Sequence, residues 1–278
     1  MAPHRFDSAY HAPVLSAEVL GVLEGARCVL DGTLGGGGHS LALLEAGASV
    51  AALDRDPEAI AAARQRLAPH ERAGRFHAEQ GNFAELDALP GLASLSFDGI
   101  LLDLGVSSHQ FDDESRGFSF REGAALDMRM EGASGWPPAR DAAGFLNEAD
   151  HAELTRVFRE YGDEPKSSRL AREIVRRRGN RPFASSDDLV AAIRAVLGPR
   201  SGPSEFARLF QAVRIAVNDE LGALARALPA LRDRLEPGGV LAVIAYHSGE
   251  DRLVKHAFRE WSQRCVCPPR QFTCTCRG

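Results

Sequence analysis

The stretch from Val29 to Ser40 most constrains the fold, because it reads as a strand, an acidic residue, a glycine-rich turn and a helix in direct succession. Asp31 ends the apolar strand, and the glycines from Gly35 to Gly38 allow positive φ angles and let a ligand touch the backbone. Amides at the start of the following helix favour a negative ligand group. The stretch therefore predicts a cofactor-binding turn at the carboxyl end of a parallel strand.

The acidic residue in front of the glycines distinguishes two cofactor classes. A dinucleotide-binding enzyme places its glycines directly after the strand, around a pyrophosphate. A methyltransferase places an acidic residue first, because S-adenosylmethionine carries no phosphate and ends in a cationic amino acid. Asp31 favours the methyltransferase, and a nucleotide-dependent dehydrogenase stays as the alternative.

Short apolar segments alternate with helical segments in the first hundred residues, and one more apolar segment follows much later. Strands are predicted at 28–30, 49–53, 75–79, 97–102 and, after a turn at 237–239, at 240–246. Helices are predicted at 40–46 and 57–67. This alternation indicates an α/β fold with a Rossmann-like parallel sheet and helices on both faces.

A long, mostly helical segment interrupts the alternation. Residues 104–140 are rich in Gly, Ser, Asp and Pro, which is typical of a functional loop. Helices are predicted at 141–146, 152–161, 166–178 and 186–197, and a helical run at 204–235 is expected to break at Pro229. We therefore expect a catalytic domain formed by 1–112 and 212–278, with an inserted helical substrate-recognition domain at 113–211.

Three predicted strands end in an aspartate: Asp31, Asp54 and Asp103. The carboxyl ends of parallel strands meet at one edge of the sheet, where open α/β sheets bind their ligands. A carboxylate at the position of Asp54 can accept both hydroxyls of a ribose. The three side chains are therefore expected to converge on one crevice.

Charge is unevenly distributed along the chain. The net charge is −5, yet residues 151–214 hold 13 Lys/Arg and 8 Asp/Glu, a local excess of +5 against −10 elsewhere. This indicates an anion-binding surface, with a solvated helical face as the alternative. The basic residues suited to phosphate contacts are Arg169, Arg172, Arg176, Arg177, Arg178 and Arg181.

The cysteines and the hydropathy indicate a reducing, aqueous compartment. Cys28 reads as a small core residue. We predict no metal site, although tetrahedral zinc at Cys265, Cys267, Cys274 and Cys276 is an alternative to a plain reduced segment. No apolar stretch of about 18 residues exists and the start lacks a signal core, so a cytoplasmic enzyme with no membrane partner is expected.

Several long motifs resemble a known family, the bacterial 16S ribosomal RNA cytosine-N4 methyltransferases, or MraW family. They occur in the family's order over nearly the whole chain. The matching segments are His11–Leu15, Asp31–Ser40, Leu53–Pro57, Gly99–Ser108, Arg116–Phe120, Leu126–Met130, Phe210–Ile215, Val217–Leu221 and His247–Lys255.

The resemblance implies a class I methyltransferase fold with a helical insert and S-adenosylmethionine as the cofactor. It implies a cytidine in the decoding region of 16S ribosomal RNA as the target, within the small ribosomal subunit, and leaves a homodimer open. The implied cofactor contacts are Gly37, Gly38, His39, Asp54, Phe83, Asp103 and Gln110.

The resemblance also indicates which residues are candidates for catalysis. Other amino-methyltransferases carry Asp/Asn-Pro-Pro-aromatic after the fourth strand, whereas this chain has Asp103 followed by Leu-Gly-Val. Asp103 is expected to bind the cofactor, orient the amine, or both. His247 is expected to orient the base or take a proton, with a structural histidine as the alternative. The aromatic that stacks on the base then comes from Phe118, Phe120 or Tyr246.

Two departures from the family pattern and three rival functions stay open. Gly249 replaces a leucine of the family, which leaves the role of Glu250 open, and the sequence ends at Gly278 where the family continues into a basic tail. The rivals are a methyltransferase for a small molecule or protein, a dehydrogenase, and a non-catalytic RNA-binding assembly factor.

Overall fold

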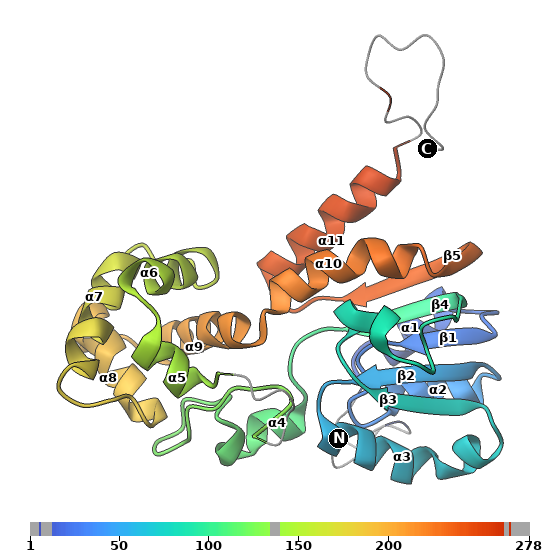
Figure 1. Ribbon diagram of the computed structural model, residues 1–278, viewed down its shortest axis with the longest axis horizontal. Helices are drawn as coiled ribbons and strands as arrows, with labels where there is room; N and C mark the ends of the chain where they lie inside the picture. The colour runs from blue at the N-terminus through green and yellow to red at the C-terminus, as the bar shows by residue number, and fades with distance from the viewer. Residues whose placement is uncertain (1–5, 7–12, 134–139, 264–266, 268–278) are drawn as a thin grey trace.

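A computed structural model describes residues 6, 13–133, 140–263 and 267, which form two lobes (Figure 1). The sheet lobe holds five strands in the order β3-β2-β1-β4-β5, and every pair is parallel. This confirms the predicted parallel sheet. The strands are β1 (Cys28–Asp31), β2 (Ser49–Asp54), β3 (Phe76–Gln80), β4 (Phe97–Asp103) and β5 (Leu235–Ile244).

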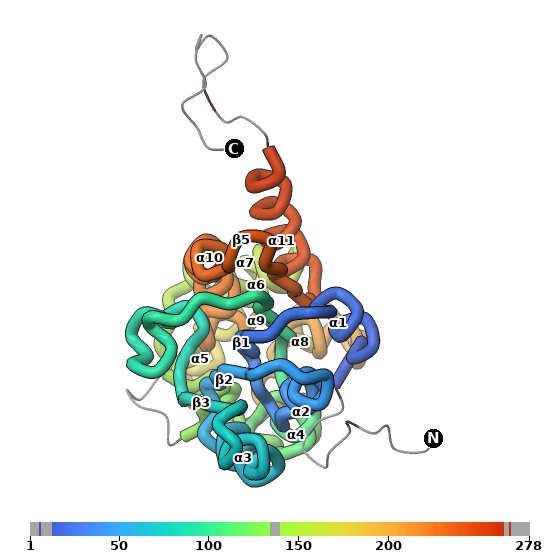
Figure 2. Tube along the Cα trace, turned by 90° about the vertical axis from the view of Figure 1, so that its right-hand side faces the viewer, coloured from blue at the N-terminus to red at the C-terminus, as the bar shows by residue number. Residues whose placement is uncertain are grey.

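Helices cover both faces of this sheet, as the apolar runs in its strands require. Figure 2 shows α1 and α2 on one side of the sheet and α10 on the other. One core packs α1, α2 and α3 against side chains such as Val29 and Val50, and the other packs η1, α10 and α11 against Leu30 and Ile100. These elements are α1 (Ser16–Val22), α2 (Gly38–Glu45), α3 (Pro57–Arg72), η1 (Phe83–Ala88), α10 (Glu220–Arg232) and α11 (Ser248–Trp261).

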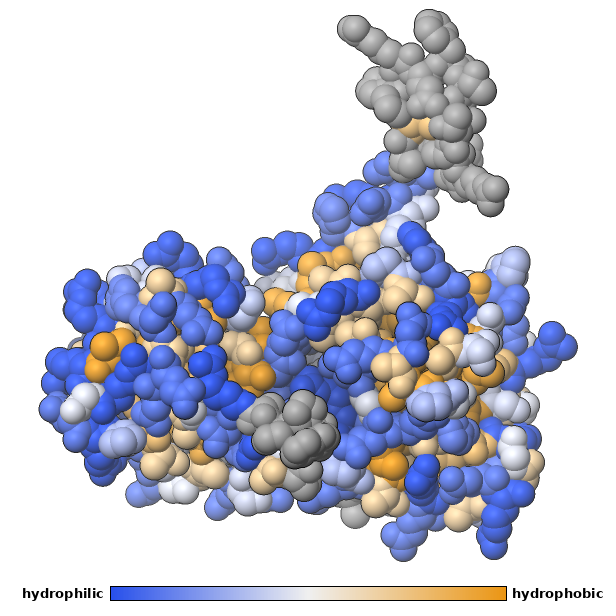
Figure 3. Space-filling view, in the orientation of Figure 1, coloured by the Kyte–Doolittle hydropathy of each residue, from blue (hydrophilic) through white to orange (hydrophobic). Residues whose placement is uncertain are grey.

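The helical lobe has a separate apolar core, formed by residues between Phe118 and Val213. The loop after β4 contributes Phe118, Leu126 and Met128 to this core, so the aromatic residues of the loop order it. The elements are α4 (Ser108–Asp112), η2 (Glu114–Arg116), α5 (Ala142–Glu148), α6 (His151–Glu160), α7 (Ser167–Arg178), α8 (Ser186–Leu197) and α9 (Pro203–Asn218). Figure 3 shows that the visible face of this lobe is mostly hydrophilic.

The break between α9 and α10 joins the two lobes. The sequence pattern predicts this break at Pro229, but Pro229 lies inside α10 and the chain turns at Asp219, which has a φ of 50°. One proline removes one backbone hydrogen bond, and the buried Leu228 and Leu231 keep α10 packed around it. The prediction at Pro229 was therefore wrong.

Asn218, the last residue of α9, forms hydrogen bonds at this joint through both the nitrogen and the oxygen of its side-chain amide. Its Nδ2 donates to the carbonyls of Met128 at 2.7 Å and Arg214 at 2.9 Å, and its Oδ1 accepts from the amide of Met130 at 2.8 Å. The guanidinium of Arg55, from the sheet lobe, donates to its backbone carbonyl at 2.9 Å. Asn218 therefore ties the loop, α9 and the sheet lobe together.

Two smaller expectations also differ from the structure. The segment 237–239 is a bulge within β5 rather than a turn before it, because the register with β4 shifts there and Gly238 has a φ of 85°. Cys28 is only partly buried. Cys265, Cys274 and Cys276 lie outside the described residues.

Candidate active site

Asp31 holds the glycine-rich turn after β1 in place through two hydrogen bonds. This side chain is 1% exposed, accepts from the Ser40 hydroxyl at 2.7 Å and from the Thr33 amide at 3.2 Å, and its pKa is raised by burial. Of the three strand-end aspartates, it is the one that does not line the cleft. Asp31 therefore shapes the turn and leaves ligand contact to its neighbours.

Asp54, at the end of β2, lies beside the glycine-rich turn. One carboxylate oxygen accepts from the Gly35 amide at 2.8 Å, and the other accepts from the Asp56 amide at 2.9 Å. Burial raises the pKa of Asp54 to about 6, although the two amides act in the opposite direction. A carboxylate has about four lone-pair sites, so each oxygen keeps capacity for one further donor.

Asp103, at the end of β4, is fixed by two side chains from different elements. Its Oδ1 accepts from the Tyr246 hydroxyl at 2.9 Å, and its Oδ2 lies 3.3 Å from His39 Nε2. Its backbone amide donates to the Thr33 hydroxyl at 2.7 Å. Tyr246 is 53% exposed, yet burial of its hydroxyl and the adjacent carboxylate raise its pKa. The arrangement presents a carboxylate held in one orientation.

His39 is the most unusual polar group of the cleft. It is 5% exposed, and neither ring nitrogen has a hydrogen bond of good geometry among the described residues. Buried polar atoms are nearly always paired. The side chain lines the cleft at the start of α2, so a bound ligand is the natural partner for it.

His39, Asp54 and Asp103 line one cleft, with about 1030 Å³ of empty space including its open mouth, at the carboxyl edge of the sheet where the strand order reverses around β1. Of the residues predicted from sequence, those that line it are Gly38, His39, Asp54, Phe83, Asp103 and Gln110. Residues that were not predicted as cofactor contacts also line it, among them Arg55, Ser107, Met130, Glu220 and Glu250.

Gly37 and His247 lie beside the cleft rather than in its lining. A Cβ on Gly37 would meet Leu67 at 3.1 Å and Ala63 at 3.3 Å, so this glycine allows α2 to approach α3. His247 caps α11: its Nδ1 accepts from the amides of Gly249 at 3.2 Å and Glu250 at 3.4 Å.

Two carboxylates that line the cleft, those of Glu220 and Glu250, lie close to His247. His247 Nε2 lies 3.1 Å from Glu250, and ligand atoms of Glu220, His247 and Glu250 lie within 4.8 Å of one another. Arg214 binds both oxygens of Glu220 at 2.8 Å. Because Nδ1 of His247 accepts hydrogen bonds, the ring proton lies on Nε2, which faces Glu250 and in this tautomer has no lone pair for a cation.

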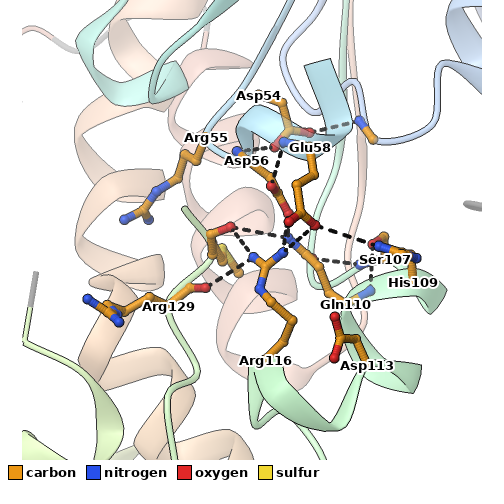
Figure 4. Close-up of polar contacts among 12 residues, drawn as sticks. Asp54, Arg55, Asp56, Glu58, Ser107, His109, Gln110, Asp113, Arg116 and Arg129 are labelled. Atoms are coloured by element: carbon orange, nitrogen blue, oxygen red, sulfur yellow. Dashed lines mark hydrogen bonds and ion pairs between the residues drawn. The ribbon is translucent and has the colours of Figure 1, made fainter. Parts of the chain in front are cut away.

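Asp56, the N-cap of α3, connects the end of β2 to the loop after β4 (Figure 4). It is 1% exposed, caps α3 by accepting from the Glu58 amide at 3.0 Å, and accepts from Gln110 and Arg116 at 2.8 Å each. Gln110 closes a capping box with Ser107 at the start of α4. The amide of Gln110 is thus committed to holding α4 against the end of β2.

Three of the five arginines of α7 bind other groups of the helical lobe, and the other two have no ion-pair partner among the described residues. Arg176 and Arg177 bind Glu173 at 2.7 Å, which lowers the pKa of Glu173 to about 2, and Arg178 donates to the carbonyls of Leu146 and Ala149. Arg169 and Arg172 are exposed and have no ion-pair partner in the described part of the chain. Arg181, just after α7, pairs with Asp188.

Comparison with known proteins identifies the family. The chain is 64% identical over 277 residues to "Ribosomal RNA small subunit methyltransferase H" of Gemmatimonas aurantiaca, covering 100% of this chain and 87% of that protein. It is 46% identical over 279 residues to the protein of the same name from Heliobacterium modesticaldum, covering 96% and 87%.

The family pattern itself matches from residue 8 to residue 278. The parallel sheet with helices on both faces is the class I S-adenosylmethionine-dependent methyltransferase fold, as the sequence predicted. Motifs, fold and relatives agree, and the chain belongs to the MraW methylase family.

Proposed function

We propose that this protein transfers a methyl group from S-adenosylmethionine to the N4 amino group of a cytidine in the decoding region of 16S ribosomal RNA. The observation that carries the proposal is the Asp103 carboxylate, held by Tyr246 at 2.9 Å in the same cleft as Asp54. The relatives' printed names, which specify ribosomal RNA of the small subunit, support the class of substrate.

The cleft fits the cofactor in three places. Asp54 keeps one acceptor site on each oxygen, which suits the two hydroxyls of a ribose. Phe83 offers an aromatic ring in the lining for the adenine, and Nδ1 of His39, which has no partner among the described residues, offers a polar group near the glycine-rich turn. When bound, S-adenosylmethionine supplies a methyl sulfonium, which is the electrophile of the reaction.

Asp103 is the residue that acts on the amino group. The lone pair of a cytosine amine is delocalised into its ring, so the nitrogen attacks poorly until a hydrogen bond acceptor orients it. The Asp103 carboxylate accepts an amino hydrogen, stabilises the positive charge that develops on nitrogen, and takes the proton. Tyr246 and His39 hold the two carboxylate oxygens during this step.

His247 contributes by positioning Tyr246. The Glu250 carboxylate accepts from the Tyr246 amide at 2.9 Å, and His247 holds the start of α11 from which Glu250 projects. Hydrogen bonding to His247 and to the Tyr246 amide lowers the pKa of Glu250 although burial opposes it, so Glu250 stays ionised. The chain from His247 through Glu250 and Tyr246 to Asp103 therefore fixes the acceptor of the amino hydrogen.

The helical lobe supplies the RNA surface. Arg169 and Arg172 lie one turn apart on α7 and keep their charges available for phosphates. We expect RNA of the small ribosomal subunit as the partner and a cytoplasmic location. Within the described residues, no helix is both long enough and apolar enough to cross a membrane.

One experiment tests the proposal directly. Small ribosomal subunits that lack the modification are incubated with the protein and labelled S-adenosylmethionine, and the methylated nucleotide is mapped by mass spectrometry. We expect one N4-methylated cytidine in the decoding region. Methylation of another atom or another RNA would refute the finer assignment, and failure to methylate any RNA would refute the function.

A further inference from the structure

A second recess, which the mechanism above does not use, opens beside the cofactor cleft. It has about 580 Å³ of empty space and lies between the loop after β4 and α9. Its lining is mostly aromatic and aliphatic, with two polar side chains: Val106, Phe111, Phe118, Phe120, Ala207, Phe210, Gln211 and Arg214.

The aromatic wall of this recess is rigid on one side and accessible on the other. The ring of Phe120 packs edge-on against Phe206 and Phe210, with ring centroids 5.8 Å and 6.0 Å away. Phe118 and Phe210 are buried, whereas Phe111, on α4, is 45% exposed. Such a wall suits a flat ring that stacks on Phe111, because aromatic faces stack on any base.

The two polar side chains of the recess have spare hydrogen-bonding capacity. Gln211 makes no side-chain hydrogen bond to any residue that the structure describes. Arg214 donates from Nε and Nη2 to the carboxylate of Glu220, and its Nη1 has no hydrogen-bond partner among the residues that the structure describes. Arg214 cannot accept a hydrogen bond, so beside it a ligand must present an acceptor atom.

Three connections join this recess to the cofactor cleft. Val106, three residues after Asp103, lines both. Gln110 lines the cleft while its neighbour Phe111 lines the recess. The ion pair between Arg214 and Glu220 has its arginine in the recess and its glutamate in the cleft.

We propose that this recess is the subsite for the target base: an extruded cytosine stacks on Phe111, with its O2 and N3 acceptors toward Gln211 and Arg214. This assignment rests on the proposed function and names the part of the site that selects the base. Enzymes that act on a base take it out of its stack into such a pocket. Uracil carries a hydrogen on N3, which would face the donor-only guanidinium, so the recess favours cytosine.

The test uses Phe111→Ala and Gln211→Ala in single-turnover methyl transfer to unmodified small subunits. Losing one stacked base is worth about 1–3 kcal/mol, so we expect Phe111→Ala to lower kcat/KM by about 5- to 150-fold. Phe111→Tyr keeps the ring and should restore the rate. Affinity for S-adenosylhomocysteine, measured by calorimetry, should stay within about twofold of wild type in all three variants.

Two matched controls separate a base subsite from a general loss of stability. Phe258→Ala removes another exposed phenylalanine, on α11, and Gln65→Ala removes a glutamine on α3 that is more exposed than Gln211. Both controls should keep the wild-type rate. The subsite is wrong if Phe111→Ala and Gln211→Ala also keep it, or if they lose cofactor affinity in parallel. A wild-type protein that methylates no cytidine N4 would instead overturn the proposed function, and this subsite with it.

Discussion

Asp54→Asn tests the cofactor site most sharply, because the structure gives both the size and the pH dependence of its effect. The Asp54 carboxylate already accepts two backbone amides, so two lone-pair sites are left for the ribose hydroxyls. Hydrogen bonds to a charged group are worth about 1.5–3 kcal/mol. At about 1.4 kcal/mol per tenfold change, we expect cofactor affinity to fall by roughly 10- to 150-fold.

The raised pKa adds a second signature. Burial raises the pKa of Asp54 to about 6, and the ionised form is the better acceptor. Wild-type affinity for S-adenosylhomocysteine should therefore fall by up to about tenfold for each pH unit below 6. Asp54→Asn carries no titrating group at this position, so its affinity should stay nearly flat between pH 7.5 and 5.

Stability of the cofactor-free protein should change in the opposite direction. The folded-state pKa of Asp54 lies above its unfolded value of 3.8, so the folded state binds more protons between pH 4 and pH 6. The free energy of unfolding of wild type, relative to Asp54→Asn, should rise as the pH falls through 6. Calorimetry and chemical denaturation at several pH values measure both quantities. Equal acid sensitivity of cofactor binding in the two proteins would refute the assignment.

Three further predictions concern the amine and the RNA. Asp103→Asn should lower turnover by about 10²- to 10⁴-fold, as expected for a lost proton acceptor, with a much smaller loss of cofactor affinity; equal losses would reduce Asp103 to a cofactor ligand. Tyr246→Phe removes the donor to that carboxylate and should lower turnover by about 10- to 100-fold without changing the calorimetric cofactor affinity. Replacing Arg169 and Arg172 with Ala should flatten the salt dependence of RNA binding by about 0.7 in log–log slope per lost contact with single-stranded RNA. Arg176→Ala, already paired with Glu173, is the control and should leave the slope unchanged.

Local sequence signals predicted the elements and the strand-end carboxylates. Strands buried on both faces read as continuous apolar runs, and this made β1, β2 and β4 recognisable up to their final aspartates. The helix that starts at Pro57 follows a capping aspartate with a proline at its first position. Such features act within a few residues, so one sequence is enough to find them.

Contacts between distant residues could not be predicted in the same way. Tyr246 reaches Asp103 only because β5 pairs with β4, which brings residues 143 positions apart into contact. Likewise, nothing near Arg178 in the sequence separates it from Arg176, although Arg178 serves the carbonyls of Leu146 and Ala149. A triple substitution that included Arg178 would therefore disturb the fold as well as the surface charge.

The joint at Asn218 has a consequence for how the substrate reaches the enzyme. With its amide fully used and Arg55 bound to its carbonyl, the joint favours one spacing between the lobes over a range of spacings. We therefore expect the two lobes to keep nearly the same spacing when RNA binds. The RNA, rather than the protein, would then have to supply the change of shape that brings the target base into the cleft.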